Sequence, residues 1–408
     1  MKIQNSLLLL VSLFIGIWQA TPATPSPVLD ANAEYQFGQS ISFTADLNPA
    51  TEITDVFVFW QTQAPESSFQ GKADIIGTQA VYTHDLTRDP LPPFSRVSYW
   101  FGVTYPDGKI DRIEGNSFIY EDTRFDWNTI TDTAPEGALD ISWVNGDLGF
   151  AQQIIDTARS GMRQAHAILP DLPAEQDDPI QIYVYPSAKD VQEALQLTGQ
   201  TWAAGHADPR LNIILVSIPQ GAAARTEMER QIPHEIMHIL LYQFVVENGG
   251  TYAYLPAWLT EGLASSTELA ANPDYPVMIY DAWQADQLLP MASLCQVFPR
   301  DPSASLLAYA QSNALVRYIQ ENYGASGLEA LIEEYADGKD CQQGSQDALE
   351  LSLNSLESEW KSDTFGTIET PKDPTRAYSW LILLGALILI PILPAFLFKR
   401  KQPESTGK

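Results

Sequence analysis

One short segment has the residue types and the spacing of a hydrolytic metal site. His234-Glu235-Ile236-Met237-His238 is an HExxH motif. On a helix, positions i and i+4 lie on one face, so both imidazoles can reach one metal ion. Glu235 lies beside that face, where it can take a proton from a water that the metal activates and pass it to a leaving amine. Zinc suits this chemistry because it lowers the pKa of bound water to about 7.

The segment around the motif predicts a buried helix over about 228–247, because its flanking residues are apolar. A chance HxxxH in a core helix is the alternative, but the chain has only 5 His in 408 residues, which makes this spacing around a Glu improbable by accident. Thr226 and Glu229 have the spacing of a capping box. Pro233 is then either a kink inside a helix that begins there or the first residue of a shorter helix.

A hydrolytic zinc site needs three protein ligands and one open position. Leu241 and Phe244 stand where the metzincin pattern requires Gly and His, so that class is excluded. Glu261 lies 23 positions after His238 in the segment WLTEGLA, which leaves room for a loop and a returning helix. We expect Glu261 to be the third ligand. The alternative is a carboxylate that only favours the N-terminal dipole of its helix.

Two other glutamates are weaker candidates for the third ligand. Glu247 is too near the end of the first helix, and Glu268 follows Glu261 by two helical turns.

The chain around these residues divides into two halves with different periodicity. Residues 27–124 predict an Ig-like β-sandwich of short strands, without the Cys…Trp…Cys core of antibody domains. We expect this half to be a spacer or a binding module. Its predicted strands include Ile41–Ala45, Val56–Trp60, Val97–Tyr105 and Phe118–Tyr120, with a turn at Pro106–Gly108.

Residues 125–370 predict an α+β domain in which a small sheet is followed by many helices. Strands are expected at Ile180–Tyr185 and Asn212–Ile218, and a helix at Leu148–Leu169. The further helices are expected at about 228–247, 256–270, 304–323, 325–336, 345–352 and 354–364.

The two ends of the chain predict an extracellular, membrane-anchored protein. Residues 1–23 have the basic start, apolar run and small-residue exit of a signal peptide, with an uncleaved anchor as the alternative. After a polar linker at 371–378, residues 379–398 predict a single transmembrane helix, with a buried core helix as the alternative. The basic tail 399–408 is then cytoplasmic.

Charge and cysteine content agree with this placement. The formal net charge of the whole sequence is -28, and the acidic excess belongs to the portion expected outside the cell, so we exclude nucleic acid as a partner. The two cysteines, Cys295 and Cys341, are expected to form a disulfide in an oxidising compartment, with two free thiols as the alternative.

Four segments, PHEIMHILL, PAWLTEGLA, LAYAQSNALVRYIQENYG and ESEW, together resemble the peptidase MA-like gluzincins. The stretch EDTRFDW, at the junction of the two halves, is similar to bacterial members with a β-domain in front. The resemblance covers about residues 120–364. It implies a gluzincin-like zinc domain in which His234, His238 and Glu261 hold Zn²⁺ and Glu235 is the general base.

The resemblance also implies a donor for the oxyanion of the transition state. By similarity Tyr309 is the candidate, with half-buried packing as the alternative role and Tyr318 and Tyr323 as other candidates. The GAMEN-type signature of aminopeptidases is absent from the sequence, so we favour endopeptidase action over trimming from the amino terminus. The strand Asn212–Ile218 is a candidate for pairing with an extended substrate, and His206 for a place near the cleft.

Three functions are compatible with these features. The favoured one is a membrane-anchored extracellular zinc peptidase whose partners are peptide or protein substrates and, through the C-terminal helix, the membrane. The second is an inactive surface binding or adhesion protein with a structural zinc site, against which the intact Glu235 argues. The third is a domain that processes only its own chain or a neighbour in the membrane. The sequence leaves the oligomeric state open.

Overall fold

The computed structural model describes residues 26–63, 68–134, 137–173, 178–196 and 205–366. The predicted signal peptide, linker, transmembrane helix and cytoplasmic tail lie outside these residues. Within them, no helix has the length and apolar character needed to cross a membrane. The described residues form two compact units, one made of the residues up to Asn248 with Thr267–Asn272, and the other of Gly249–Ser266 with the described residues from Pro273 onward.

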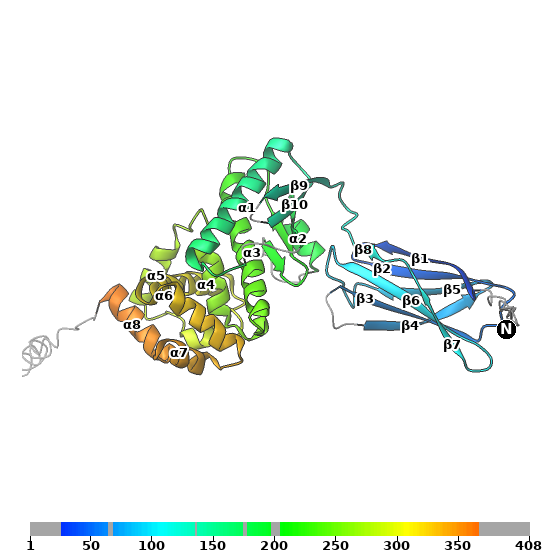
Figure 1. Ribbon diagram of the computed structural model, residues 1–408. Helices are drawn as coiled ribbons and strands as arrows, with labels where there is room; N and C mark the ends of the chain where they lie inside the picture. Colours follow the sequence, from blue (N-terminus) through cyan, green and yellow to red (C-terminus); the bar gives the residue numbers. More distant parts are fainter. Residues whose placement is uncertain (1–25, 64–67, 135–136, 174–177, 197–204, 367–408) are drawn as a thin grey trace, which may run out of the picture. The chain divides into compact units, whose positions relative to one another are not determined.

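The first unit begins with an antiparallel β-sandwich, coloured blue to cyan in Figure 1. Its strand order is β1-β2-β5-β4-β3-β6-β7, and β8 pairs with β6. β4 pairs with β3 along its first part and with β5 at its end, which joins the two sheets. The strands are β1 (Val28–Gln36), β2 (Ser40–Leu47), β3 (Asp55–Thr62), β4 (Ser68–Ile76), β5 (Gln79–Asp85), β6 (Arg96–Thr104), β7 (Ile110–Glu114) and β8 (Phe118–Ile119).

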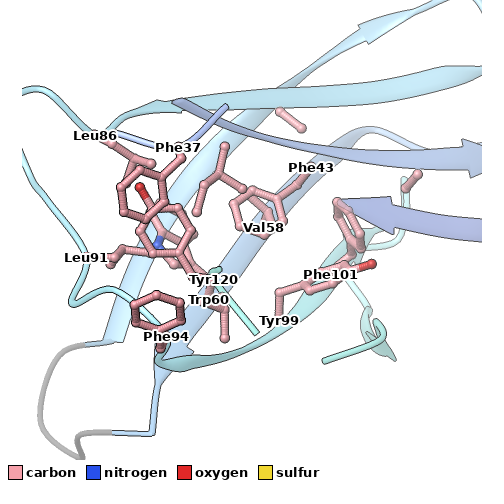
Figure 2. Packing of buried hydrophobic residues seen from close by; sticks show 14 of the residues in the cluster. Phe37, Phe43, Val58, Trp60, Leu86, Leu91, Phe94, Tyr99, Phe101 and Tyr120 are labelled. Carbon is pink, nitrogen blue, oxygen red and sulfur yellow. The ribbon is translucent and has the colours of Figure 1, made fainter. Parts of the chain in front are cut away.

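Aromatic side chains fill the core between the two sheets, as Figure 2 shows. The rings of Phe43 and Trp60 lie 5.3 Å apart, and those of Phe43 and Tyr99 lie 5.1 Å apart. The side chains of β2 and β3 alternate between buried and partly exposed, as expected for strands with one face in the core. The predicted β-rich N-terminal half is therefore confirmed.

The junction stretch EDTRFDW joins the sandwich to the next sheet of the same unit. The fully buried carboxylate of Asp122 accepts a hydrogen bond at 2.7 Å from Arg124 and another at 3.1 Å from the hydroxyl of Tyr185. Burial, with the nearby Asp122 charge, raises the pKa of Tyr185 far above its usual range, so this phenol stays a neutral donor. Nearby, the rings of Phe94 and Tyr183 stack at 3.5 Å. Both polar and apolar contacts therefore hold the sandwich to the sheet.

The second sheet of this unit has the order β12-β13-β11-β10-β9. The three central strands are parallel, and the two outer strands pair antiparallel to their neighbours. The predicted strands at 180–185 and 212–218 are confirmed. Strands β9, β10 and β12 were not predicted; β9 consists mostly of polar residues, and β12 has only four residues. The strands are β9 (Asn128–Ala134), β10 (Gly137–Trp143), β11 (Ile180–Tyr185), β12 (Gly205–Asp208) and β13 (Ile213–Ser217).

Two long helices of the same unit pack against each other and against this sheet. α1 (Leu148–Ile168) contacts β10, and α3 (Ala224–Glu247) contacts β12 and β13. The short helix α2 (Ala188–Ala194) contacts β11 and β13. The predicted helices at 148–169 and about 228–247 are confirmed.

The predicted capping box at the start of α3 is wrong. The helix begins at Ala224, and its N-cap residue Ala223 makes no side-chain capping bond. Glu229 instead accepts a hydrogen bond at 2.7 Å from Arg225, one turn earlier. Pro233 therefore lies inside a helix that begins well before it, which is the first of the two expected alternatives.

The second unit is helical. Gly262 in α4 lies very close to α6: a Cβ at this position would be only 2.6 Å from the carbonyl oxygen of Ser312. The absence of a side chain at Gly262 therefore permits the close packing of the two helices. The two helices predicted at 304–323 and 325–336 are confirmed as the two parts of α6, which are separated by the non-helical backbone of Gly324 (φ 71°, ψ -172°). Helix α5 was not predicted. The helices are α4 (Ala257–Thr267), α5 (Tyr275–Gln284), α6 (Pro302–Ala336), α7 (Cys341–Leu349) and α8 (Leu353–Phe365), with short 3-10 turns at Tyr252–Tyr254 and Met291–Leu294.

The predicted disulfide between Cys295 and Cys341 is present. Cys341 is the first residue of α7, and the carbonyl of Cys295 accepts a hydrogen bond at 3.1 Å from the N–H of Ala257, the first residue of α4. The cross-link thus ties α7 to the residue that anchors the start of α4. This is the helix that carries Glu261.

Removal of this cross-link should destabilise the protein. For Cys295→Ser combined with Cys341→Ser, we expect the free energy of unfolding to fall by about 3–4 kcal/mol, because the unfolded chain regains the freedom of the closed loop. Denaturant unfolding of the full chain measures the change. Reduction of the native protein should give the same shift, and an unchanged midpoint in both experiments would contradict the prediction.

Candidate metal centre

The structure brings the three predicted ligands together. His234 and His238 come from α3 and Glu261 comes from α4, and each offers one ligand atom within 4.8 Å of the other two. The two imidazole rings lie 5.2 Å apart in an edge-to-face arrangement. All three residues are half-buried, so the group is accessible without being fully solvated.

This donor set fits a divalent metal ion. Imidazole nitrogens suit zinc and other late transition metals, and a carboxylate oxygen beside two imidazoles completes a ligand set found in catalytic zinc sites. Two atoms that each lie about 2 Å from one ion are at most about 4 Å apart, so small side-chain rotations are enough to bring all three to one ion. His234, His238 and Glu261 form a possible metal-binding site.

A buried carboxylate fixes the orientation of the first histidine. Nδ1 of His234 lies 3.2 Å from Oε1 of Glu268, whose side chain is only 5% exposed. When Nδ1 donates this hydrogen bond, Nε2 is left with its lone pair for an ion. Glu268, the weaker candidate for a ligand, is therefore the hydrogen-bond partner of a ligand.

The proline before the motif helps to hold Glu268 in place. Pro233 has no N–H, so the carbonyl of Glu229 loses its normal partner in the helix. The N–H of Leu269 donates to this carbonyl at 2.8 Å. The hydroxyl of Thr267 donates to the carbonyl of Pro233 at 2.9 Å. The residues on both sides of Glu268 are thus hydrogen-bonded to the turn of α3 that carries His234.

Glu235 is buried beside the edge strand β12. Only 8% of this residue is exposed, and Gly205 of β12 faces it so closely that a Cβ would lie 2.5 Å from Oε1 of Glu235. The strand can approach the carboxylate because position 205 has no side chain. The carboxylate of Glu235 on α3 therefore lies against the edge strand of the sheet, and Glu235 directly follows the ligand candidate His234 in sequence.

The other candidates are placed as follows. Tyr309 is half-buried on α6 with its ring edge-to-face to Phe298 at 4.9 Å, and its role as an oxyanion donor stays a prediction. The hydroxyl of Tyr318 donates to Asp363 at 2.8 Å, and burial together with this bond raises the pKa of Tyr318 to about 12. Tyr323 is half-buried on the same helix, and Glu247 is exposed at the end of α3.

The strand expected to pair with substrate has no free edge. β13 is hydrogen-bonded to β11 on one side and to β12 on the other, so it cannot accept a further strand. Among the strands of the described residues, β12 forms this edge of the sheet. His206 lies on β12 and is exposed, which places it on the edge strand that approaches Glu235.

Three residues have roles at the candidate site that the sequence did not predict. Gly205 and Gly262 are single glycines inside a strand and a helix, where glycine costs stability and often marks a close approach. That signal was available for both. Glu268 was weighed only as a ligand, because its contact with His234 depends on how the chain turns after α4.

The sequence pattern of the peptidase MA superfamily matches residues 158–366. No curated protein sequence matches the chain.

Several solved structures resemble parts of the chain. An aminopeptidase N family protein from Idiomarina loihiensis aligns over 83% of this chain and 71% of its own, with 7% identity and a TM-score of 0.32. A structure titled as a myokine covers 24% of this chain and 97% of its own, with 8% identity and a TM-score of 0.20. A bromine derivative of BhCBM56 covers 24% and 96%, with 13% identity and a TM-score of 0.18.

The family match spans α3 with both histidines and the helical unit with Glu261. It includes every residue of the possible metal site, and it suggests a peptidase-type function. The chain belongs to the peptidase MA superfamily.

Proposed function

We propose that this protein is a zinc-dependent peptidase that hydrolyses peptide bonds, with His234, His238 and Glu261 as the zinc ligands. The observation that carries the proposal is that two imidazoles of α3, the helix that also bears Glu235, lie with the Glu261 carboxylate of α4 so that one ligand atom of each is within 4.8 Å of the others. Two imidazoles with one carboxylate form a three-ligand set known from catalytic zinc sites, which keep a fourth position open. A purely structural zinc site does not need Glu235.

Each residue has a defined task in this reaction. Bound zinc supplies Lewis acidity, which acidifies a water molecule and polarises the carbonyl of the scissile bond. Glu235 takes a proton from the attacking water and delivers it to the leaving amine. Glu268 keeps the ring of His234 in one orientation and one tautomer. Tyr309 is our proposed donor to the oxyanion that develops in the transition state.

We further propose that the peptidase acts outside the cell and is anchored by its C-terminal segment. The apolar run at 379–398 with the basic residues that follow it supports the anchor, and the signal-like residues 1–23 support export. The disulfide between Cys295 and Cys341 supports an oxidising compartment.

The assigned base predicts a separation of metal binding from activity. Glu235→Gln keeps the shape of the side chain but cannot accept the proton, so we expect cleavage of a peptide library to fall about 100- to 10,000-fold. Zinc content, measured by elemental analysis, should stay at one ion per chain. Glu247→Gln at the exposed end of α3 is the matched control. Unchanged cleavage by Glu235→Gln would overturn the assignment of the base.

The close approach of β12 predicts that a single methyl group is enough to disturb the base. In Gly205→Ala the new Cβ would meet Oε1 of Glu235, which is the mobile end of its side chain. We expect the fold and zinc content to persist while cleavage falls about 100-fold, because the base is displaced by about 1 Å. Circular dichroism and zinc analysis are the controls. Full activity would show that Glu235 works from a different position.

The hydrogen bond to His234 predicts a change in metal affinity. Glu268→Gln removes the negative charge that makes His234 a more basic ligand, so the Kd for zinc should rise about 10- to 100-fold. Competition with a chromophoric chelator measures this Kd without reference to activity. Glu247→Gln again serves as the control. An unchanged Kd would mean that Glu268 does not act on the ligand.

A further inference from the structure

A pocket of about 280 Å³ lies on the opposite side of β12 from Glu235. Its wall is mostly apolar and includes Leu91, Ile213 and Leu215, together with the prolines of the loop 90–93 from the sandwich. Its polar residues are His206, Asp208 and Arg210. The contacts between the sandwich and the second sheet, all within the first unit, therefore build this pocket.

The register of the edge strand separates two faces of the sheet. His206 pairs with Leu215 and Asp208 pairs with Ile213, and all four line the pocket. Gly205 belongs to the alternate set of residues and faces Glu235 on α3. One strand thus has the proposed base on one face and the pocket on the other.

A peptide that extends the sheet at β12 would use both faces. Its backbone would pair with the edge strand, and its side chains would point alternately to the two faces. Side chains on one face would lie beside Glu235. The neighbouring side chain along the peptide would enter the pocket.

The lining selects the chemistry of that side chain. The apolar wall and the volume suit one large apolar side chain such as Phe, Tyr or Leu. Asp208 and Arg210, both in the lining of the pocket, pair with each other through hydrogen bonds of 3.1 and 3.2 Å, so the lining presents a neutralised pair rather than a single charge. A charged substrate side chain would lose its hydration there without a dedicated counter-charge.

We propose that this pocket behind β12 is the specificity subsite of the peptidase, and that it takes a large apolar side chain of a peptide paired with β12. The proposal rests on the proposed peptidase function and adds the class of substrate residue. We expect a preference of about 10- to 100-fold for Phe, Tyr or Leu over Ala at one substrate position, since a hydrophobic pocket discriminates to this extent.

Cleavage of a diverse peptide library by the zinc-loaded full chain tests the proposal, with the cleaved bonds identified by mass spectrometry. In Leu195→Trp a bulky ring fills the pocket from the end of α2, and in His206→Trp the ring covers the pocket from an exposed strand position. Both variants should shift the preference at that one position to Gly, Ala or Ser and leave the other positions unchanged. Lys189→Trp, on the exposed face of α2 and outside the pocket, is the control and should keep the native profile.

The outcomes separate the two proposals. If the native protein cleaves no peptide when loaded with zinc, the peptidase function and the subsite both fail. If it cleaves peptides but shows no preference for large apolar residues, or if both pocket variants keep the native profile, only the subsite is overturned.

Discussion

The proposed site depends on one hydrogen bond that a regular helix could not make. Pro233 leaves the carbonyl of Glu229 without a helical donor, and the N–H of Leu269 takes that place at 2.8 Å. If the carbonyl of Glu229 had no donor, the loss of its hydrogen bond would cost free energy. This hydrogen bond therefore stabilises the position of the segment after α4 against this turn of α3. Glu268 is part of that segment, and its carboxylate therefore meets His234. The missing helical hydrogen bond at Pro233 thus helps to support a candidate metal ligand.

Two glycines control how closely other elements reach the same region. Gly205 lets the edge strand β12 pass beside the carboxylate of Glu235. Gly262, which directly follows Glu261 in α4, lets this helix pack against the carbonyl of Ser312 in α6. Any larger residue would push a strand or a helix outward. Since a group that transfers protons must be placed to within a fraction of an ångström, the absence of a side chain at these positions matters for the proposed chemistry.

The β-sandwich also contributes to the region of the edge strand. The buried carboxylate of Asp122 accepts hydrogen bonds from Arg124 and Tyr185, and the ring of Phe94 stacks on Tyr183. These contacts bring the proline-containing loop 90–93 to the side of β12 that faces away from Glu235. The proposed subsite is therefore shared by two β-structures, and the sandwich is more than a spacer in this proposal.

The sequence by itself determined the local features of this protein. The spacing of His234 and His238 follows from helix periodicity, and Glu261 was recognisable from its helix of small and apolar residues. Several strands, including β11 and β13, and the long helices follow from hydrophobic periodicity. The pairing of Cys295 with Cys341 followed from there being only two cysteines. Only the tertiary structure decided which strand forms the edge, that Glu268 supports His234, and that Gly205 faces Glu235. These are contacts between residues distant in sequence, and periodicity has no information about them because it reports only which face of an element is buried.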